Sequence, residues 1–295
     1  MGSPGRGSKD RGPMALKIFD HLATRFPTAV LSLACTLALG ACDKAPVAWR
    51  GDALSVPIPT SGDESSAPVD AHLVLRSDGS PALEAIAAVP SMPHDSLACA
   101  GSFRVSALSS TEIYGVWWSK RAGGRAALLA SRSDDAGGTW MPPVPVDTTD
   151  RGAAGCSRPA PAIAADGSSG YVHVAYFLNA VGGPGVFFAH SMERGELFHS
   201  PVPIMYGDRP SSTAVAAADS VVVVAFEDPN SERAQIALAM SRTWGHIFTP
   251  ERPEVSIGTP EAQRPLVALR KQSVAVGWRG KDRGIVARVG TLRMN

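Results

Sequence analysis

A repeat of roughly fifty residues constrains this chain of 295 residues more than any other feature. Residues 133–140 read SDDAGGTW and match the pattern S-x-D-x-G-x-T-W at every specified position. Weaker copies of this box stand at 191–198 (SMERGELF) and 241–248 (SRTWGHIF). The aromatic residues that end the three boxes lie 58 and 50 residues apart. Such spacing is typical of a protein built by repeating one small structural unit.

Other marks keep the same step along the chain. A proline follows each box by five residues, and a strand-like apolar run precedes it. Earlier in each unit, a second apolar run ends in an aromatic residue. An arginine opens each unit, at intervals of 54, 51 and 55 residues: Arg104, Arg158, Arg209 and Arg264. Each unit therefore predicts up to four short strands, one for each of these marks.

Four strands in about 40–50 residues indicate one blade of a β-propeller, so the expected fold class is all-β. The last unit, 264–295, has no box and no fourth strand, whereas 73–86 resemble a strand pair. Because closure removes exposed strand edges, we expect N- and C-terminal strands to close a ring of about four to five blades. The first box is expected to form a tight turn through its serine, aspartate, glycine, threonine and tryptophan, namely Ser133, Asp135, Gly137, Thr139 and Trp140.

The box, its weaker copies and residues 102–108 (SFRVSAL) resemble the Asp-box, or BNR-repeat, propellers of the sialidase superfamily. The resemblance covers about 100–290 and implies that Arg104 matches the arginine that binds the substrate carboxylate. Sialidases of this family have six blades, three such arginines, an aspartate acid/base and a Tyr–Glu nucleophile pair. Here the loop 119–125 contains no carboxylate, and the last repeat contains no tyrosine. The resemblance therefore implies the fold without the full catalytic set.

Alternating strand direction places the start of every first strand on one face of the ring. We call it the arginine face, defined by Arg104, Arg158, Arg209 and Arg264. Guanidinium groups bind carboxylate or phosphate in a bidentate manner, which predicts an anion site there. Alternatively, each arginine pairs with a neighbouring aspartate or carbonyl and joins two blades. Repetition in every unit favours the second interpretation, with Arg104 the best single candidate for ligand binding.

Binding of an acidic sugar, another anion or a partner protein, without hydrolysis, is the leading functional hypothesis. The alternative is an exo-acting, sialidase-type glycoside hydrolase in which Arg104 holds the carboxylate and Glu227 or Asp228 supplies acid/base chemistry. A third hypothesis is a structural envelope component that docks a protein. We expect no cofactor, and no metal because the seven histidines lack metal-ligand spacing. A net charge of +1 with 19% charged residues argues against a polybasic nucleic-acid binder and a disordered chain.

The N-terminal segment has the pattern of a lipoprotein signal peptide. Residues 29–39 form an apolar run of 11, too short to span a bilayer, and 39–42 (LGAC) match a lipobox. An ordinary signal peptide with a chance cysteine is the alternative. We expect a signal peptide over 1–41 (with Met14 as an alternative start), a flexible tether over 42–70 and the propeller over 71–295. Lipid on Cys42 would anchor the protein outside the cytoplasm, and Asp43 favours the periplasmic side of an inner membrane.

Two cysteines remain for the mature domain. Cys35 leaves with the signal peptide, and Cys42 takes the lipid. Cys99 and Cys156 are expected to form a disulfide in an oxidising compartment, the alternative being two buried thiols.

Overall fold

The computed structural model describes residues 45–58, 71–86, 89–280 and 284–293. From Ala45 onward, the chain forms one compact unit. The expected signal peptide, Cys42 and residues 59–70 of the expected tether lie outside the described residues. Within the described ranges, no helix is long and apolar enough to cross a membrane.

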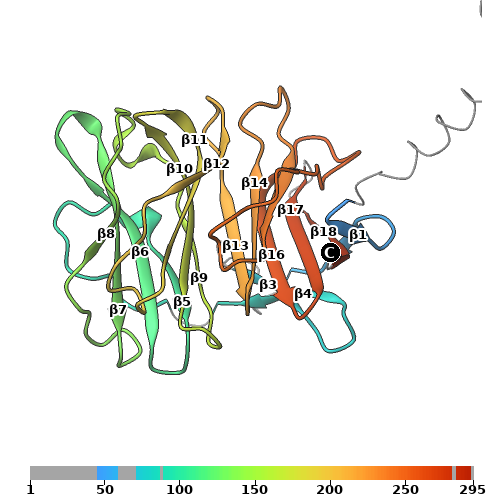
Figure 1. Ribbon diagram of the computed structural model, residues 1–295, viewed down its shortest axis with the longest axis horizontal. Helices are drawn as coiled ribbons and strands as arrows, with labels where there is room; N and C mark the ends of the chain where they lie inside the picture. The colour runs from blue at the N-terminus through green and yellow to red at the C-terminus, as the bar shows by residue number, and fades with distance from the viewer. Residues whose placement is uncertain (1–44, 59–70, 87–88, 281–283, 294–295) are drawn as a thin grey trace, which may run out of the picture. The chain divides into compact units, whose positions relative to one another are not determined.

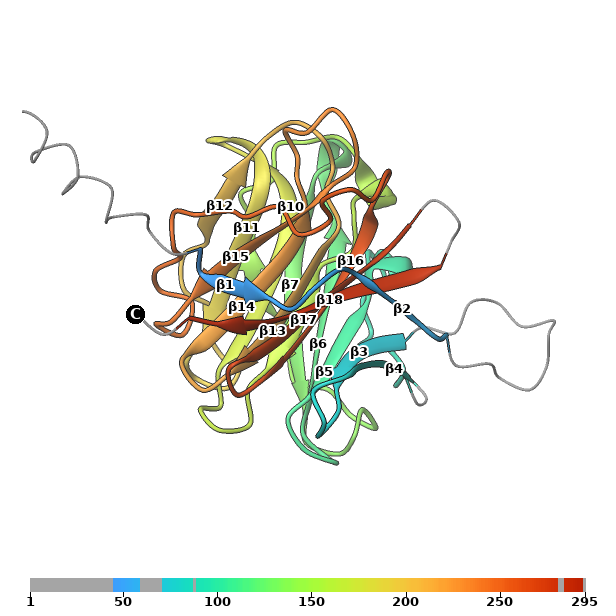
Figure 2. The ribbon, with the colours of Figure 1, turned by 90° about the vertical axis from the view of Figure 1, so that its right-hand side faces the viewer.

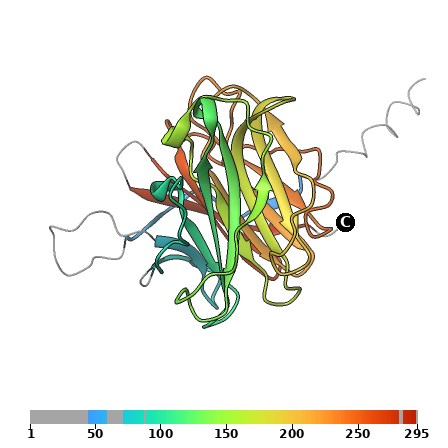
Figure 3. The same ribbon diagram turned by 90° about the vertical axis from the view of Figure 1, so that its left-hand side faces the viewer.

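Antiparallel strands make up nearly all of the regular structure, which confirms the all-β prediction. The first sheet contains β5 (Arg104–Ala107), β6 (Ile113–Lys120), β7 (Ala126–Ser133) and β8 (Val144–Asp147), drawn in green in Figures 1 and 3. The second contains β9 (Ala162–Ala165), β10 (Val172–Ala180), β11 (Gly183–Ser191) and β12 (Val202–Tyr206). The third contains β13 (Thr213–Ala218), β14 (Val221–Glu227) and β15 (Ile236–Ser241). The fourth contains β16 (Gln263–Arg270), β17 (Ser273–Arg279) and β18 (Ile285–Leu292).

Sheets that follow one another in sequence also pack against one another. Trp118 and Tyr176 share a hydrophobic cluster between the first and second sheets, and Phe188 and Phe226 share one between the second and third. The buried run VVVVAF of β14 explains how one sheet can pack against two neighbouring sheets. Val223 and Ala225 point into the cluster with the fourth sheet, whereas the alternate residues point toward the second. A strand buried on both faces needs such a continuous apolar run.

Residues from the N-terminal side complete the fourth sheet. β1 (Val47–Trp49) and β2 (Leu54–Val56) both pair antiparallel with β18, and Figure 2 shows them in blue beside the red strands. The interpretation of 42–70 as a tether is therefore wrong for 47–56. Val47 and Val56 are buried, and pairing satisfies the backbone groups along the edge of β18.

The pair of strands expected at 73–86 forms a separate hairpin of β3 (Ala71–Leu75) and β4 (Pro81–Ala85). It packs on the face of the fourth sheet instead of extending it. Leu73 and Leu83 share a cluster there with Ala268, Ala275 and Ala287. Small alanine side chains leave room for the leucines, so burial of apolar surface decides the position of the hairpin.

Residues 89–99 cover the outer face of the first sheet. Trp117 Nε1 donates to Asp95 Oδ2 (2.9 Å), Trp140 Nε1 donates to the Ser91 carbonyl (2.9 Å), and Cys99 N donates to the Trp118 carbonyl (2.8 Å). This segment begins four residues after β4, which covers the fourth sheet. Four residues span at most roughly 14 Å. The coverings of the first and last sheets therefore lie close together.

Candidate functional site

Arg158 lies in the corner between the first two sheets, where it is buried. Its Nη2 pairs with Asp150 Oδ2 at 2.5 Å and donates to the carbonyls of Gly124 (3.2 Å) and Gly152 (3.1 Å). These groups belong to the β6–β7 loop and to the chain that leaves β8. The guanidinium thus joins neighbouring segments, as the structural interpretation of the repeated arginines expects.

Arg209 has a similar role between β12 and β13. Its Nη2 donates to the Asp228 carbonyl (2.8 Å) and to Ser231 Oγ (3.3 Å), both in the β14–β15 loop. Arg104 and Arg264 are exposed instead. Arg104 Nη1 donates to carbonyls of its own loop, Phe103 at 2.7 Å and Gly101 at 3.2 Å. None of the four arginines lines either of the hollows described below.

Each of the two carboxylates proposed for acid/base chemistry accepts a hydrogen bond from a backbone N–H group. Glu227 Oε1 accepts the backbone N–H of Arg264 at 2.8 Å, which brings Glu227 to the start of the fourth sheet. Asp228 Oδ1 accepts the backbone N–H of Asn230 at 2.8 Å within its own loop. The structure thus joins Glu227 to the backbone of Arg264 rather than to its guanidinium.

A hollow of about 580 Å³ opens on the outer face of the first sheet. Residues 94–96, the end of β6 and the chain around β8 surround it. Its polar rim includes Asp95, Arg121 and His94. Ser96, Ser119 and Thr148 add hydroxyl groups to the lining, and Leu129, Pro143 and Pro145 add apolar surface. Ligand pockets commonly have this volume and this mixture of a few polar groups with apolar surface.

Asp95 remains a carboxylate within this hollow. Burial acts to raise its pKa, but hydrogen bonds from Trp117, Ser119 and the Leu97 N–H, together with the charge of Arg121, outweigh that effect and lower it. Arg121 is exposed, and its Nη1 donates to Ser119 Oγ (3.2 Å) and to the Lys120 carbonyl (3.1 Å). The hollow thus presents the Asp95 carboxylate as a hydrogen-bond acceptor beside the solvent-exposed guanidinium of Arg121.

A disulfide holds the chain near this hollow. Cys99 and Cys156 are bonded, with Cα atoms 5.3 Å apart and a sequence separation of 57. Cys99 precedes η1 (Ala100–Ser102), and Cys156 lies in η3 (Gly155–Ser157). The bond ties the segment that covers the first sheet to the chain that enters the second. A crosslink over a loop of this length stabilises a fold by about 2–4 kcal/mol.

The box at 133–140 forms a hydrogen-bonded turn between β7 and β8. Ser133 Oγ donates to Asp135 Oδ1 (2.7 Å), which also accepts the Thr139 N–H (2.7 Å). The Thr139 N–H and hydroxyl, then Ser133, lower the pKa of Asp135 to about 2. The weaker boxes keep part of this pattern, because Ser191 Oγ accepts the Gly195 N–H (2.9 Å) and Ser241 Oγ accepts the Gly245 N–H (3.0 Å).

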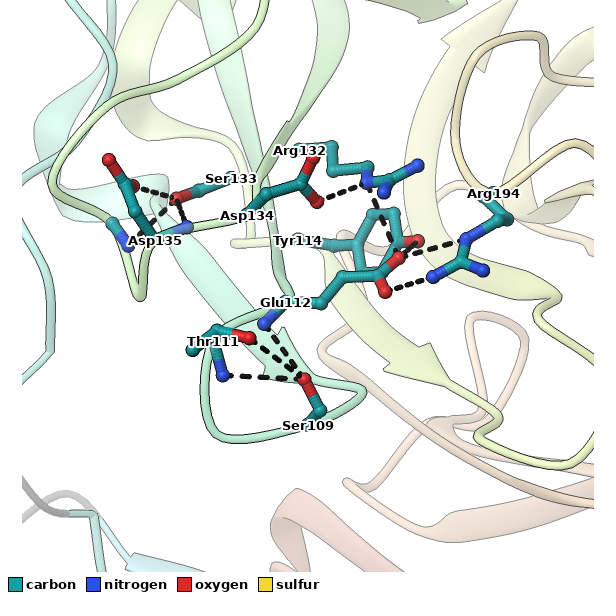
Figure 4. A network of polar contacts seen from close by, with 10 residues as sticks. Ser109, Thr111, Glu112, Tyr114, Arg132, Ser133, Asp134, Asp135 and Arg194 are labelled. Atoms are coloured by element: carbon teal, nitrogen blue, oxygen red, sulfur yellow. Dashed lines mark hydrogen bonds and ion pairs between the residues drawn. The ribbon is translucent and has the colours of Figure 1, made fainter.

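A network of polar contacts around the buried Glu112 was not predicted from the sequence (Figure 4). Glu112 accepts a bidentate interaction from Arg194 of the second box and a 2.5 Å hydrogen bond from the Tyr114 hydroxyl. Arg132 Nε lies 3.3 Å from the same carboxylate. Burial acts to raise the pKa of Glu112, but the Tyr114 and Arg194 hydrogen bonds and the arginine charges lower it. The sequence offered one signal for it, the spacing of two residues between Glu112 and Tyr114.

Tyr114 is paired with a carboxylate but is not poised as a nucleophile. Its side chain is 1% exposed, and burial followed by the hydrogen bond and charge of Glu112 raises its pKa. Tyr176 is fully buried, donates to Asp147 Oδ2 (2.6 Å) and has its pKa raised by burial and by that carboxylate. A phenol acts as a nucleophile when a neighbouring base, a metal or a lowered pKa activates it and a substrate can reach it. Burial keeps substrate away from both side chains. Neither tyrosine meets these conditions.

Histidines gather between the second and third sheets. His190 lies at the centre, with its ring 4.9 Å from that of His199 and 4.5 Å from that of His246. His173 packs on Phe188 in the same cluster, and neither of its ring nitrogens has a hydrogen-bond partner. Among the residues that the structure describes, no group of three or more His, Cys, Asp or Glu side chains is arranged to hold a metal ion.

No protein-family model and no curated protein matches this sequence. Some solved structures are similar to part of this chain. The Hadza microbial sialidase Hz136 is 15% identical with a TM-score of 0.48, over 66% of this chain and 44% of that one. The Trypanosoma rangeli sialidase is 12% identical with a TM-score of 0.44, over 74% of this chain and 39% of that one. A variant of the Aleuria aurantia lectin in complex with α-methyl-L-fucoside is 7% identical with a TM-score of 0.40, over 64% and 60% of the two chains. The similarity spans less than two thirds of each of these proteins.

Proposed function

We propose that this protein is a carbohydrate-binding β-propeller that holds an acidic sugar in the hollow of the first sheet and does not hydrolyse it. The observation that carries the proposal is the exposed Arg121 beside Asp95 on the rim of that hollow. A guanidinium binds the carboxylate of an acidic sugar in a bidentate manner, and a carboxylate accepts sugar hydroxyls. The apolar surface that Leu129, Pro143 and Pro145 add to the lining suits the C–H face of a sugar ring.

The surroundings of Tyr114 and Tyr176 support binding without hydrolysis. Retaining glycosidases need a nucleophile and an acid on either side of the scissile bond. Tyr114 and Tyr176 are buried with raised pKa values, and Glu227 and Asp228 accept backbone N–H groups. Ring closure is part of the proposal: the four sheets form a ring, with the β3–β4 hairpin as an incomplete fifth blade.

Substitution of Arg121 tests the proposed site. In calorimetric titration with sialyllactose, Arg121→Gln should weaken binding about ten- to hundredfold, because one bidentate, charge-assisted contact is lost. Arg151→Gln removes an exposed arginine outside the hollow and should leave the affinity unchanged. Absence of sialyllactose binding by the unmodified protein, or equal affinity in both variants, would exclude this site. Turnover of a fluorogenic sialoside that disappears in Arg104→Ala would instead establish the hydrolase.

Lipid anchoring outside the cytoplasm completes the proposal. The Cys99–Cys156 disulfide supports this location, because such bonds persist in oxidising compartments. Mass spectrometry of the membrane-extracted protein should find Cys42 as the N-terminal residue, carrying a diacylglycerol group. An N-terminus at another residue, with an unmodified Cys42, would contradict the anchor.

A further inference from the structure

A second hollow, of about 460 Å³, is bordered by cationic side chains from three separate parts of the chain. Arg50 follows β1, Arg76 lies in the β3–β4 turn, Arg270 ends β16, and Lys271 lies in the β16–β17 turn. All four residues are exposed. We call this site the basic hollow, defined by these four residues.

The remaining lining of the basic hollow carries no negative charge. Its other residues are small, polar or apolar, namely Leu75, Ser77, Gly79, Gln272, Ser273 and Thr291. In the described part of the chain, none of the four cations forms an ion pair. Asp78 lies in the same turn as Arg76 but does not line the hollow, and its Oδ1 accepts both the N–H (2.8 Å) and the hydroxyl (2.7 Å) of Ser80. These hydrogen bonds, and after them the charge of Arg76, lower the pKa of Asp78. Positive charge in this hollow is therefore not neutralised by a lining carboxylate.

Specific hydrogen bonds hold the segments around the hollow. Arg270 Nη1 donates to the Arg76 carbonyl at 2.7 Å, across 194 residues of sequence. Arg50 Nη2 donates to Thr291 Oγ1 at 2.8 Å, across 241 residues. Each bond uses one guanidinium nitrogen and leaves others able to donate. The cations are thus gathered by the fold, although like charges repel one another when no anion lies between them.

We infer that the basic hollow binds a multiply charged oxyanion of the phosphate class. Guanidinium groups donate to phosphate oxygens through two parallel N–H bonds, and lysine adds a point charge. Ser77, Ser273 and Gln272 can supply neutral donors on the same border. Because the hollow is open to solvent, both free phosphate and the phosphate of a lipid headgroup are accessible sources. This site is independent of the acidic-sugar site, with which it shares no lining residue.

A pair of charge-matched double variants tests the basic hollow in the full-length protein. Arg76→Gln with Lys271→Gln removes two cations whose side chains make no hydrogen bond within the described structure. Arg151→Gln with Arg233→Gln removes the same charge from exposed positions that do not line the hollow. Titration with inorganic phosphate should show affinity reduced about ten- to hundredfold in the first double variant only. Added salt should weaken binding by the unmodified protein.

Vesicles distinguish the two sources of phosphate. They would contain phosphatidylcholine alone or mixed with phosphatidic acid. Because lipid on Cys42 would hold the protein on vesicles of either composition, the readout is the binding to mixed vesicles in excess of that to phosphatidylcholine alone. An excess that falls only in Arg76→Gln/Lys271→Gln would assign the hollow to a lipid headgroup, whereas the same pattern with inorganic phosphate alone would assign it to a free anion. If both double variants match the unmodified protein with both probes, or if neither probe binds, the inference is wrong.

Discussion

Acidification from pH 7 to pH 5 is expected to lower the free energy of unfolding by about 3–4 kcal/mol through two histidines. His173 is 0% exposed, and burial followed by the charges of His190 and His246 lowers its pKa to about 3, although Asp166 opposes the shift. His190 is 6% exposed, and burial followed by His246 and His199 lowers its pKa to about 4, opposed by Glu193.

The direction of this pH dependence follows from proton binding in the folded and unfolded states. Below the ordinary pKa of about 6.5, the unfolded chain binds protons at both histidines while the folded chain does not. Stability from these groups is therefore complete above that value and is lost as the pH falls toward 4 and 3. Each group contributes about 1.4 kcal/mol per pH unit within this window. Urea titrations followed by tryptophan fluorescence at several pH values would measure the slope.

Replacement of His173 isolates its contribution. His173→Leu should remove about half of the pH dependence, because the buried imidazole has no hydrogen bond to lose. His72→Gln, which changes an exposed histidine of β3, should leave the slope unchanged. A slope that is flat in the unmodified protein, or equal in His173→Leu, would contradict protonation of this cluster as the cause.

Asp150→Ala should be the most destabilising single substitution that we predict, by about 3–5 kcal/mol. The side chains of Arg158 and Asp150 are 4% and 1% exposed, so the variant would leave a buried guanidinium without its counter-charge. It would also remove the acceptor of the Ala126 N–H, which lies 2.6 Å from Asp150 Oδ2. Chemical denaturation midpoints would measure the loss.

Two further variants separate charge pairing from general sensitivity. Asp208→Ala removes an exposed carboxylate and is expected to change stability by less than about 0.5 kcal/mol. Combining Asp150→Ala with Arg158→Met should recover part of the stability, because no unpaired charge stays buried. If Asp150→Ala costs no more than Asp208→Ala, then Arg158 does not depend on this partner and the structural role assigned to it is wrong.

The repeat predicted the local elements well because its signals are local. A run such as VVVVAF in β14 has the length and composition of a buried strand. In the first box, side chains of the turn accept hydrogen bonds from its own backbone N–H groups. The direction of each strand could likewise be predicted by counting along the unit. These properties depend on residues within one unit and need no knowledge of its neighbours.

The roles of the four arginines could not be predicted from the sequence, which left both anion binding and the joining of blades open. Arg158 and Arg209 are bound by carbonyls of loops that approach only after sheets have packed. Every residue has a carbonyl, so no sequence pattern marks which ones will accept a guanidinium. The Glu112–Arg194 contact was missed for the same reason, because 82 residues separate its members.

The sequence by itself determined the all-β class, the succession of strands and the turns of the boxes, because hydrophobic period and turn chemistry act over a few residues. Tertiary structure alone decided that 47–56 complete the last sheet, and that β3–β4 lie on its face. It also decided where cations gather, since the basic hollow draws its side chains from segments about two hundred residues apart. Such long-range contacts depend on the packing of whole sheets, which no local sequence pattern encodes.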